Sequence, residues 1–295
     1  LFAIHPVQVE TVCWISASKI VLSTFFYLSA LICYIQYMRN SKWQYLLASV
    51  VSSILAMGCK EQSVIIVPCL LLFDWMLFKR NMRSLKVYIE KVYYLIPAIA
   101  IFIVTLVANK NTGEEIIGYT IVDRFIFLCY SSFKYLLISA IPFKLSYLYP
   151  FPFQVGEKIP MALWIYPFVI LFIGYVIYLN RRKPLLVFCT LFFILHLLPV
   201  LHVIPLPRYV VAADRYLYIP YIAFAIGLSI LSYHLYERQR KWILYAGFLY
   251  CSYLCVYTAG YAPAWKNSDT LKEHFKEVLK KRETNLSINF KHEKQ

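Results

Sequence analysis

Long apolar runs alternate with short polar segments along the whole chain. Runs near the roughly 20 residues that a helix needs to cross a bilayer occur at 20–38, 43–58, 62–78, 92–108, 161–179, 185–204, 217–236 and 242–262. The pattern predicts an all-α integral membrane protein, built as a multi-span helical bundle of about eight transmembrane helices.

Basic residues gather in four short segments between these runs, at Arg39 with Lys42, Lys79 to Lys91, Arg181 to Lys183, and Arg238 to Lys241. Cytoplasmic loops carry an excess of lysine and arginine, and placing all four segments in the cytoplasm gives every span a consistent direction. The polar residues expected on the outer face are then His5, Glu10, Lys60, Glu61, residues 109–160, and Asp214 with Arg215.

One further apolar segment, from Asp123 to Pro142, would invert the second half of this topology if it crossed the membrane. Its apolar face is interrupted by four polar residues, Arg124, Ser131, Ser132 and Lys134. We therefore expect an amphipathic helix that lies along the outer interface. Residues 143–160 are rich in aromatic residues and proline, which indicates an ordered interfacial loop.

Composition excludes an ordinary soluble domain. Of the 295 residues, 61% are hydrophobic and 15% are charged, whereas a soluble domain carries about 25% charged residues. The net charge of +15 comes from the short basic segments between apolar runs, so it predicts a lipid bilayer as partner and no nucleic acid. The eight cysteines include no CxxC pair, so neither a disulfide framework nor a zinc site is expected.

The expected domain division is a transmembrane core over residues 1–263 and an extracytoplasmic amphipathic tail over residues 264–295. In the tail, Thr270 with Glu273 predicts a capping box. Leu271, Phe275, Val278 and Leu279 then share one face of a basic helix ending near Arg282. Because the chain opens on Leu1 at the end of an apolar segment, we expect an N-terminally truncated piece of a longer protein.

The segment from His5 to Glu10 is the first candidate for chemistry. One explanation is an interfacial turn, in which Pro6 ends a helix, His5 and Glu10 are in contact with water, and Trp14 anchors the chain at the interface. Alternatively, the Glu10 carboxylate faces a site bordering lipid and acts as a metal ligand, a partner of a general base or an anchor for a polar substrate. The identity of any metal is left open.

The second candidate is the segment that contains Arg208, Asp214, Arg215 and Tyr216. Two guanidinium groups at the outer surface can clamp a phosphate bidentately. Asp214 is expected to orient Arg215, and Tyr216 to anchor at headgroup depth. The spacing supports binding of an anionic lipid headgroup, and it does not distinguish an enzyme from a transporter.

Other ionisable residues favour structural explanations. Lys60 with Glu61 fits a salt bridge as well as it fits a substrate contact. Asp74 is expected to make a hydrogen bond that packs helices. His196 and His202 are expected to be packed or interfacial, because no second ligand lies at a suitable spacing.

Taken in order along the chain, these segments resemble a known family. The stretch from Ile4 to Ser23 carries His-Pro-Val-Gln-Val-Glu, then Trp14-Ile15-Ser16 and Val21-Leu22-Ser23. It is similar to the outer junction before a long span in membrane proteins with tetratricopeptide repeats, including the transmembrane-and-tetratricopeptide O-mannosyltransferases. Further matches are Cys59-Lys60-Glu61-Gln62, the stretch from Arg124 to Tyr149-Pro150, Ala213-Asp214-Arg215-Tyr216 with Tyr218 and Pro220, and Trp265 with Ser268 and Thr270.

The resemblance implies a fold like the GT-C class, multi-span glycosyltransferases that move a sugar from a polyprenyl or dolichyl phosphate carrier to an acceptor at the outer face. It implies a hexosyltransferase whose partners are the bilayer, a polyprenyl-phosphate sugar donor, and a protein or glycan acceptor. Arg215, with Arg208, would hold the carrier phosphate as it leaves. Glu10 would contribute to the environment of the acceptor or of a metal. The metal cofactor to consider is a divalent cation.

The family's acidic pair would lie upstream of Leu1 and its repeats beyond the tail, so this segment alone is expected to be inactive. Within the match, Ser18 and Ile20 stand where many members have Arg and Asp, which puts a complete catalytic site in doubt. Two alternatives to the enzyme are a non-catalytic scaffold that displays a tetratricopeptide domain and a transporter of lipid-linked sugar. We expect a bacterial inner membrane ahead of the endoplasmic reticulum.

Overall fold

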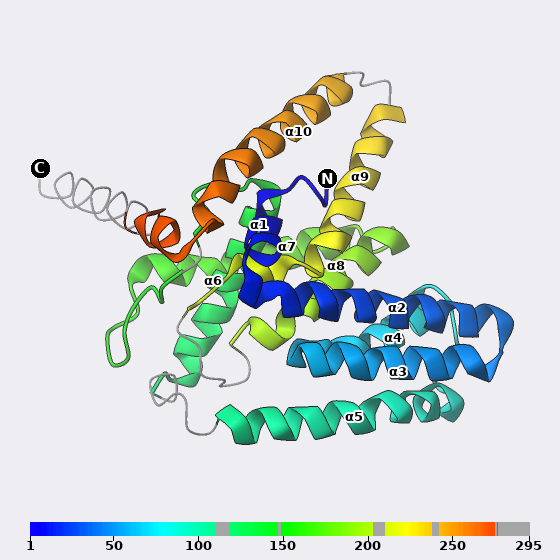
Figure 1. Cartoon of the computed structure of the whole chain (residues 1–295). Coiled ribbons are helices and arrows are strands. Elements are labelled where there is room, and N and C mark those ends of the chain that lie inside the picture. Colours follow the sequence, from blue (N-terminus) through cyan, green and yellow to red (C-terminus); the bar gives the residue numbers. More distant parts are fainter. Residues whose placement is uncertain (110–117, 147–148, 203–209, 238–241, 275, 277–295) are drawn as a thin grey trace, which may run out of the picture.

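The computed structural model describes residues 1–109, 118–146, 149–202, 210–237, 242–274 and 276, and these form a helical protein (Figure 1). Within them, β-type pairing is limited to an isolated antiparallel bridge between Tyr149 and Ala212. The all-α class is thereby confirmed.

The principal helices follow the apolar runs closely. They are α1 (Val9–Cys13), α2 (Ser18–Asn40), α3 (Trp43–Cys59), α4 (Ile66–Met76), α5 (Leu85–Asn109), α6 (Ile121–Ala140), α7 (Ile165–Leu179), α8 (Pro184–Leu197), α9 (Pro220–Glu237) and α10 (Trp242–Tyr261). Short 3-10 helices join them, among which η1 (Pro6–Gln8), η3 (Glu61–Ile65) and η6 (Asp214–Leu217) matter for the site.

Four helical segments are long and apolar enough to cross a membrane: Ile15–Asn40, Leu85–Ala108, Met161–Leu179 and Trp242–Trp265. Trp43–Cys59 and Pro184–Val200 are apolar but shorter. A membrane protein with several candidate spans is therefore supported, while eight crossings remain a prediction. α9 and α10 project away from the layer formed by α2 to α5 (Figure 1).

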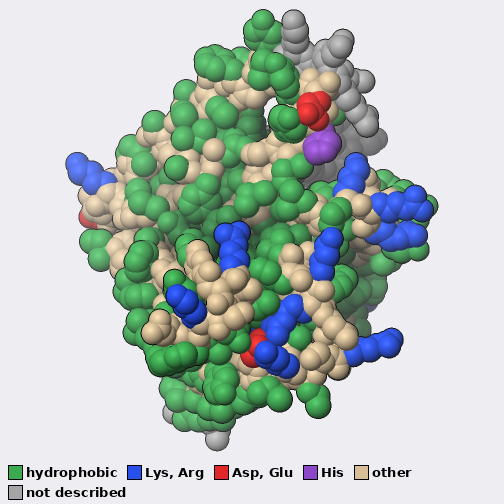
Figure 2. All heavy atoms as spheres, turned by 90° about the vertical axis from the view of Figure 1, so that its right-hand side faces the viewer, with side chains coloured by type: hydrophobic (Ala, Val, Ile, Leu, Met, Phe, Trp, Pro, Cys, Tyr) green, Lys and Arg blue, Asp and Glu red, His purple; other side chains and the backbone are tan. Residues whose placement is uncertain are grey.

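The turns α2–α3 and α4–α5 lie at the same end of this layer (Figure 1). We call this end the basic end. Figure 2 shows lysine and arginine side chains spread over this face with few acidic ones. Arg39, Lys42, Lys79, Arg83 and Lys86 are exposed in these turns and the adjoining first turn of α5. The first two basic segments thus share one side of the molecule, as the topology requires.

The loop expected over residues 79–91 is confirmed only as far as Ser84, because α5 begins at Leu85 and buries Glu90 and Lys91. Lys91 Nζ lies 2.6 Å from Asp74 Oδ2, and Arg80 Nη1 lies 2.5 Å from Glu90 Oε2. Since a buried charge is costly without a partner, these four residues assemble as two acid–base pairs, which we call the Asp74 cluster.

The helix-packing role expected for Asp74 is confirmed. Tyr34 on α2 donates a hydrogen bond of 2.6 Å to Asp74 Oδ1 on α4. Lys91 on α5 donates to the Tyr34 hydroxyl, also over 2.6 Å. The cluster therefore ties three helices together near the basic end.

The segment expected to be an amphipathic helix is α6. Its first turn is closed by a capping box, in which Thr120 and Asp123 exchange side-chain and backbone hydrogen bonds. One face is buried, through Ile126, Phe127, Tyr135 and Ile138, while Val122, Phe125 and Leu137 are exposed. Its position relative to a membrane remains a prediction.

The tail begins with a cap different from the expected one. Asn267 Oδ1 accepts hydrogen bonds from the backbone N–H groups of Asp269 and Thr270, at 3.1 and 2.8 Å. Asn267 directly precedes the first helical residue, so its side chain reaches the free N–H groups that a helix start leaves. Thr270 is thus the third helical residue and not the cap. The expected positions Phe275, Val278, Leu279 and Arg282 lie outside the described helix residues.

Candidate functional site

Glu10 and Arg215 form the centre of the site. Arg215 donates its backbone N–H to Glu10 Oε2 over 2.9 Å, and its Nη1 lies 2.5 Å from Glu10 Oε1. α1 and η6 supply the two residues, which are 205 positions apart. The structure therefore brings together the two segments that the sequence singled out.

The two members of the pair differ in exposure. The Glu10 side chain is fully buried, whereas 20% of the Arg215 side chain is exposed. Glu10 is not in contact with water, as the interpretation of this segment as an interfacial turn expected, because the guanidinium and the η6 backbone cover its carboxylate. The guanidinium also lies 5.5 Å from the Trp14 ring and 5.0 Å from the Tyr216 ring, within the range of cation–π attraction.

Burial sets the electrostatics of this pair. It raises the pKa of the Glu10 carboxyl, and the charge and hydrogen bonds of Arg215 oppose that rise. Burial also acts to lower the pKa of Arg215, but Glu10 and Tyr216 outweigh it, so the net pKa is raised. Arg215 is therefore a permanent cation held at the edge of a dry site.

The expectation that Asp214 orients Arg215 is wrong, since Glu10 does so. Asp214 is fully buried and points the other way, where its Oδ1 accepts a hydrogen bond of 2.9 Å from the Tyr149 hydroxyl. Its Oδ2 is buried without a hydrogen-bond partner. Burial, followed by the charge of Glu10, raises the pKa of the Asp214 carboxyl well above its ordinary value.

Tyr149 was missed as a site residue. Its backbone carbonyl accepts from Val211 N over 2.8 Å, next to the bridge with Ala212, and this pairing aims its hydroxyl at Asp214. The signal available in the sequence was the alternation of Tyr149, Phe151 and Phe153. Tyr149 and Phe153 are buried and Phe151 is half-buried.

Arg215 also lines a narrow polar pocket next to the ion pair. The other polar residues that line it are Ser23, Thr24, Tyr27, Lys60, Gln62, Ser63, His196, Tyr216 and Tyr218. Its volume is about 30 Å³, which is room for roughly two water molecules. The site thus carries two cationic side chains, from Lys60 and Arg215, which are far apart in the sequence.

The polar pocket is held in shape by its own hydrogen bonds. His196 Nε2 lies 2.8 Å from the Tyr27 hydroxyl, and Ser23 Oγ lies 2.7 Å from Ser63 Oγ. Lys60 Nζ is 2.5 Å from Glu61 Oε1, and 41% of the Glu61 side chain is exposed. The expectation that His196 is packed is confirmed, although its ring also borders the pocket.

The remaining candidates do not line the pocket. His5 is fully buried, not wetted, with its ring 4.3 Å from that of Tyr221, and burial lowers its pKa to about 4. His202 is buried, with Nε2 2.9 Å from the Val211 carbonyl. Arg208 lies outside the described residues. No group of three or more His, Cys, Asp or Glu side chains that could hold a metal occurs in the described part of the chain.

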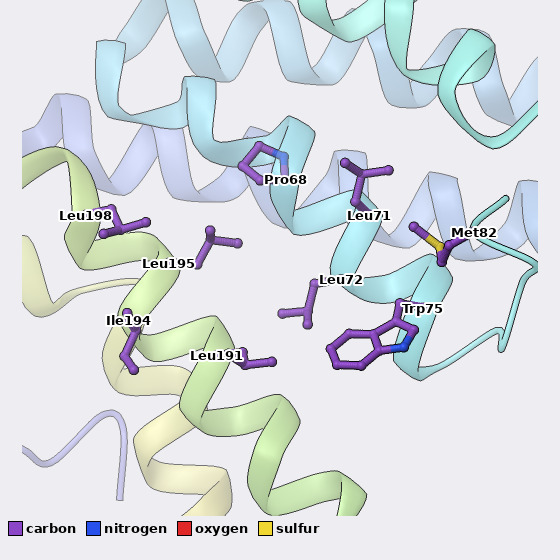
Figure 3. A pocket seen from close by; sticks show the side chains of 9 residues that line it. All are labelled: Pro68, Leu71, Leu72, Trp75, Met82, Leu191, Ile194, Leu195 and Leu198. Atoms are coloured by element: carbon purple, nitrogen blue, oxygen red, sulfur yellow. The ribbon is translucent and has the colours of Figure 1, made fainter. Parts of the chain in front are cut away.

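An apolar groove of about 480 Å³ runs between α4 and α8. Figure 3 shows Pro68, Leu71, Leu72 and Trp75 of α4 facing Leu191, Ile194, Leu195 and Leu198, with Met82 at one end. Ile65 and His196 of the polar pocket lie three residues or fewer from Pro68 and Leu195 of the groove. The linings of the polar pocket and the apolar groove therefore come from neighbouring residues of the chain at both places.

Comparison with known proteins found no matching family model, no similar curated protein and no similar solved structure.

Proposed function

We propose that this chain is the core of a membrane glycosyltransferase that takes a sugar from a polyprenyl or dolichyl phosphate carrier. The observation that carries the proposal is a polar pocket with two cations and an apolar groove, whose linings come from neighbouring residues of the chain. The pocket offers the cations of Lys60 and Arg215, and the groove offers an apolar wall. A lipid phosphate has a matching anionic head and apolar chain.

In this proposal, the carrier phosphate accepts hydrogen bonds from Arg215 and Lys60, and the first part of its chain lies along the groove. From Pro68 to Trp75 the groove follows α4 for about 10 Å, at about 1.5 Å per residue. When the bond between sugar and phosphate breaks, negative charge develops on the leaving phosphate. The two cations stabilise that charge in a site that excludes most water.

The narrow pocket must widen before a phosphate enters it. Lys60 is the side chain best placed to move, because its partner Glu61 is 41% exposed, whereas Glu10, the partner of Arg215, is fully buried. Arg215 is held more firmly, by its contacts with Glu10. Donor binding is then expected to exchange the Lys60–Glu61 pair for a contact between Lys60 and phosphate.

The finer parts of the proposal follow the resemblance. They are a GT-C-like bundle of about eight spans, a site on the outer face, a protein or glycan acceptor, and a bacterial inner membrane ahead of the endoplasmic reticulum. Glu10 would hold Arg215 in place, and Asp214 would hold Tyr149 through its hydrogen bond. The described residues contain no group of three or more His, Cys, Asp or Glu side chains that would hold a divalent cation. Other residues would have to bind it.

Measuring the binding of a lipid phosphate to this chain tests the proposal. A polyprenyl phosphate is titrated into the protein in nanodiscs, with a polyprenol of the same length as the uncharged comparison. Arg215→Ala is expected to weaken phosphate binding at least tenfold, as loss of a charge-assisted hydrogen bond predicts, with Arg215→Lys recovering part. Lys60→Gln is a second variant that leaves the Glu10 pair intact, and Arg39→Gln at the basic end is the control.

Transfer of the sugar is then measured in the longest natural chain that contains this segment. Equal binding of polyprenol and polyprenyl phosphate, with Lys60→Gln and Arg215→Lys unchanged, would reject the donor site.

A non-catalytic membrane scaffold is the second candidate, and one observation favours it. Arg215 is already paired with a fully buried carboxylate, so its charge has a structural task without any ligand. If the protein is a scaffold, Arg215→Lys would reduce its stability. Sugar transfer by the wild type and by every variant would stay at background.

A further inference from the structure

A further cavity, which Tyr149 helps to line, lies between α6 and the loop that follows it. Its volume is about 740 Å³, which is in the range of sites for ligands of drug size or larger. Tyr149 forms part of its wall and is itself bonded to Asp214. We call it the Lys134 cavity.

The lining of this cavity combines two cations with apolar and aromatic walls. Lys134 comes from α6 and Lys144 from the loop, and the described lining residues include no acidic side chain. Lys134 Nζ lies 4.8 Å from the centre of the Tyr149 ring, which holds the ammonium at the wall. Lys144 is exposed, with its Nζ 5.2 Å from the Phe143 ring.

The mouth of the cavity is apolar. Leu137, Ile141 and Phe143 are 46, 59 and 65% exposed, and all three line the cavity. In a chain with membrane-spanning helices, such side chains are covered by lipid chains when they lie at hydrocarbon depth. Tyrosine and lysine, which also line the cavity, are typical of the headgroup level.

We propose that the Lys134 cavity binds an anionic phospholipid, with the phosphate between Lys134 and Lys144 and the acyl chains against Leu137, Ile141 and Phe143. Charge decides the lipid class, because Lys134 and Lys144 both line the cavity and two ammonium groups favour a headgroup with net negative charge. This site is distinct from the polar pocket and does not depend on the proposed transfer reaction.

A bound lipid at this place would also act on the neighbouring site. Its phosphate would contact the wall that contains Tyr149, and Tyr149 holds Asp214, the residue next to Arg215. Anionic lipid is therefore expected to order η6 as well as the loop, and its binding is expected to raise the thermal stability of the protein.

Native mass spectrometry of the purified protein tests the site, with phosphatidylglycerol and phosphatidylcholine added separately. We expect one tightly bound phosphatidylglycerol and a clear preference for it over phosphatidylcholine. Near an anionic headgroup each lysine contributes roughly fivefold to affinity. The double variant Lys134→Gln/Lys144→Gln should therefore lose more than about tenfold of that preference.

Lys158→Gln is the matched control, because Lys158 is exposed in the same loop and does not line the cavity. The double variant Lys134→Arg/Lys144→Arg preserves both charges and should retain the preference for phosphatidylglycerol. This result would show that the loss of preference in the Gln double variant is electrostatic. Inorganic phosphate at millimolar concentration should not displace the lipid. Displacement by phosphate alone, equal binding of the two lipids, or full preference in the Gln double variant would overturn the proposal.

Discussion

Arg215 donates hydrogen bonds to both carboxylate oxygens of Glu10, one from its backbone and one from its guanidinium. A single residue thus fixes the carboxylate by two routes, so the side chain of Arg215 can be changed while the backbone contact remains. This separates the role of the charge from the role of the turn in η6.

Loss of the Arg215 charge should destabilise the protein strongly. Arg215→Met leaves Glu10 buried without its cation, and breaking a buried ion pair in this way costs about 3–5 kcal/mol. The double variant Glu10→Met/Arg215→Met removes both charges and should recover much of that loss. Thermal unfolding in detergent measures both, with Arg39→Met as the exposed control. Equal melting temperatures for the single and double variants would mean that removing the unpaired carboxylate recovers nothing, which would contradict the expected penalty for a buried Glu10 without its cation.

Asp214 should make stability depend on pH. Its pKa is raised in the folded protein, chiefly by burial, so the folded state binds the proton more tightly than the unfolded state does. The stabilisation is complete below the ordinary pKa of about 4 and is lost as the pH rises through the raised folded pKa.

Asp214→Asn keeps the shape of the protonated carboxyl and removes its titration. Between pH 4 and pH 8, the stability of the variant relative to the wild type should therefore increase with pH. Melting curves at steps of one pH unit measure this difference, and a difference that stays constant across the range would show that Asp214 does not titrate there. Asp123→Asn provides a comparison, because Asp123 lies at the start of α6 away from the site.

The Asp74 cluster should hold α2, α4 and α5 together. Lys91→Met removes the cation closest to Asp74, and we expect destabilisation of about 3 kcal/mol, because the buried carboxylate then keeps its hydrogen bond from Tyr34 but only the longer, 3.3 Å contact with a cation, Arg80. Lys86→Met, an exposed substitution on the same helix, should have little effect. If both variants unfold at the same temperature, the cluster does not stabilise the helix packing.

Membrane sidedness can be measured by labelling single cysteines. The accessible native cysteines are replaced, and the buried Cys69, Cys129 and Cys189 are retained because the fold shields them. Cysteine at Lys158 should react with an impermeant reagent from outside, whereas cysteine at Lys42 or Asn180 should react only after permeabilisation. Labelling of Asn180 from outside would mean that the second half is inverted and that α6 crosses the membrane.

The sequence predicted helices well, because apolar runs and basic turns depend on local composition. Two of its errors concern side chains whose partners are not local. Asp214 was paired with its neighbour Arg215, although adjacent residues in a helical turn point in different directions. The partner of Arg215 lies 205 residues away, and no local pattern encodes that distance. Likewise, the sequence places Glu90 and Lys91 in a loop, because nothing local indicates that Arg80 and Asp74 are their partners.

The separation of Glu10 and Arg215 also sets an order of events during synthesis. At about 5–20 residues per second, Arg215 leaves the ribosome about 10–40 s after Glu10. Throughout that interval the carboxylate lacks the cation that accompanies it in the finished protein, so it stays in water or takes up a proton. Insertion of the last third of the chain then closes the site, and any nascent chain that stops earlier exposes an unpaired acid to quality control at the membrane surface.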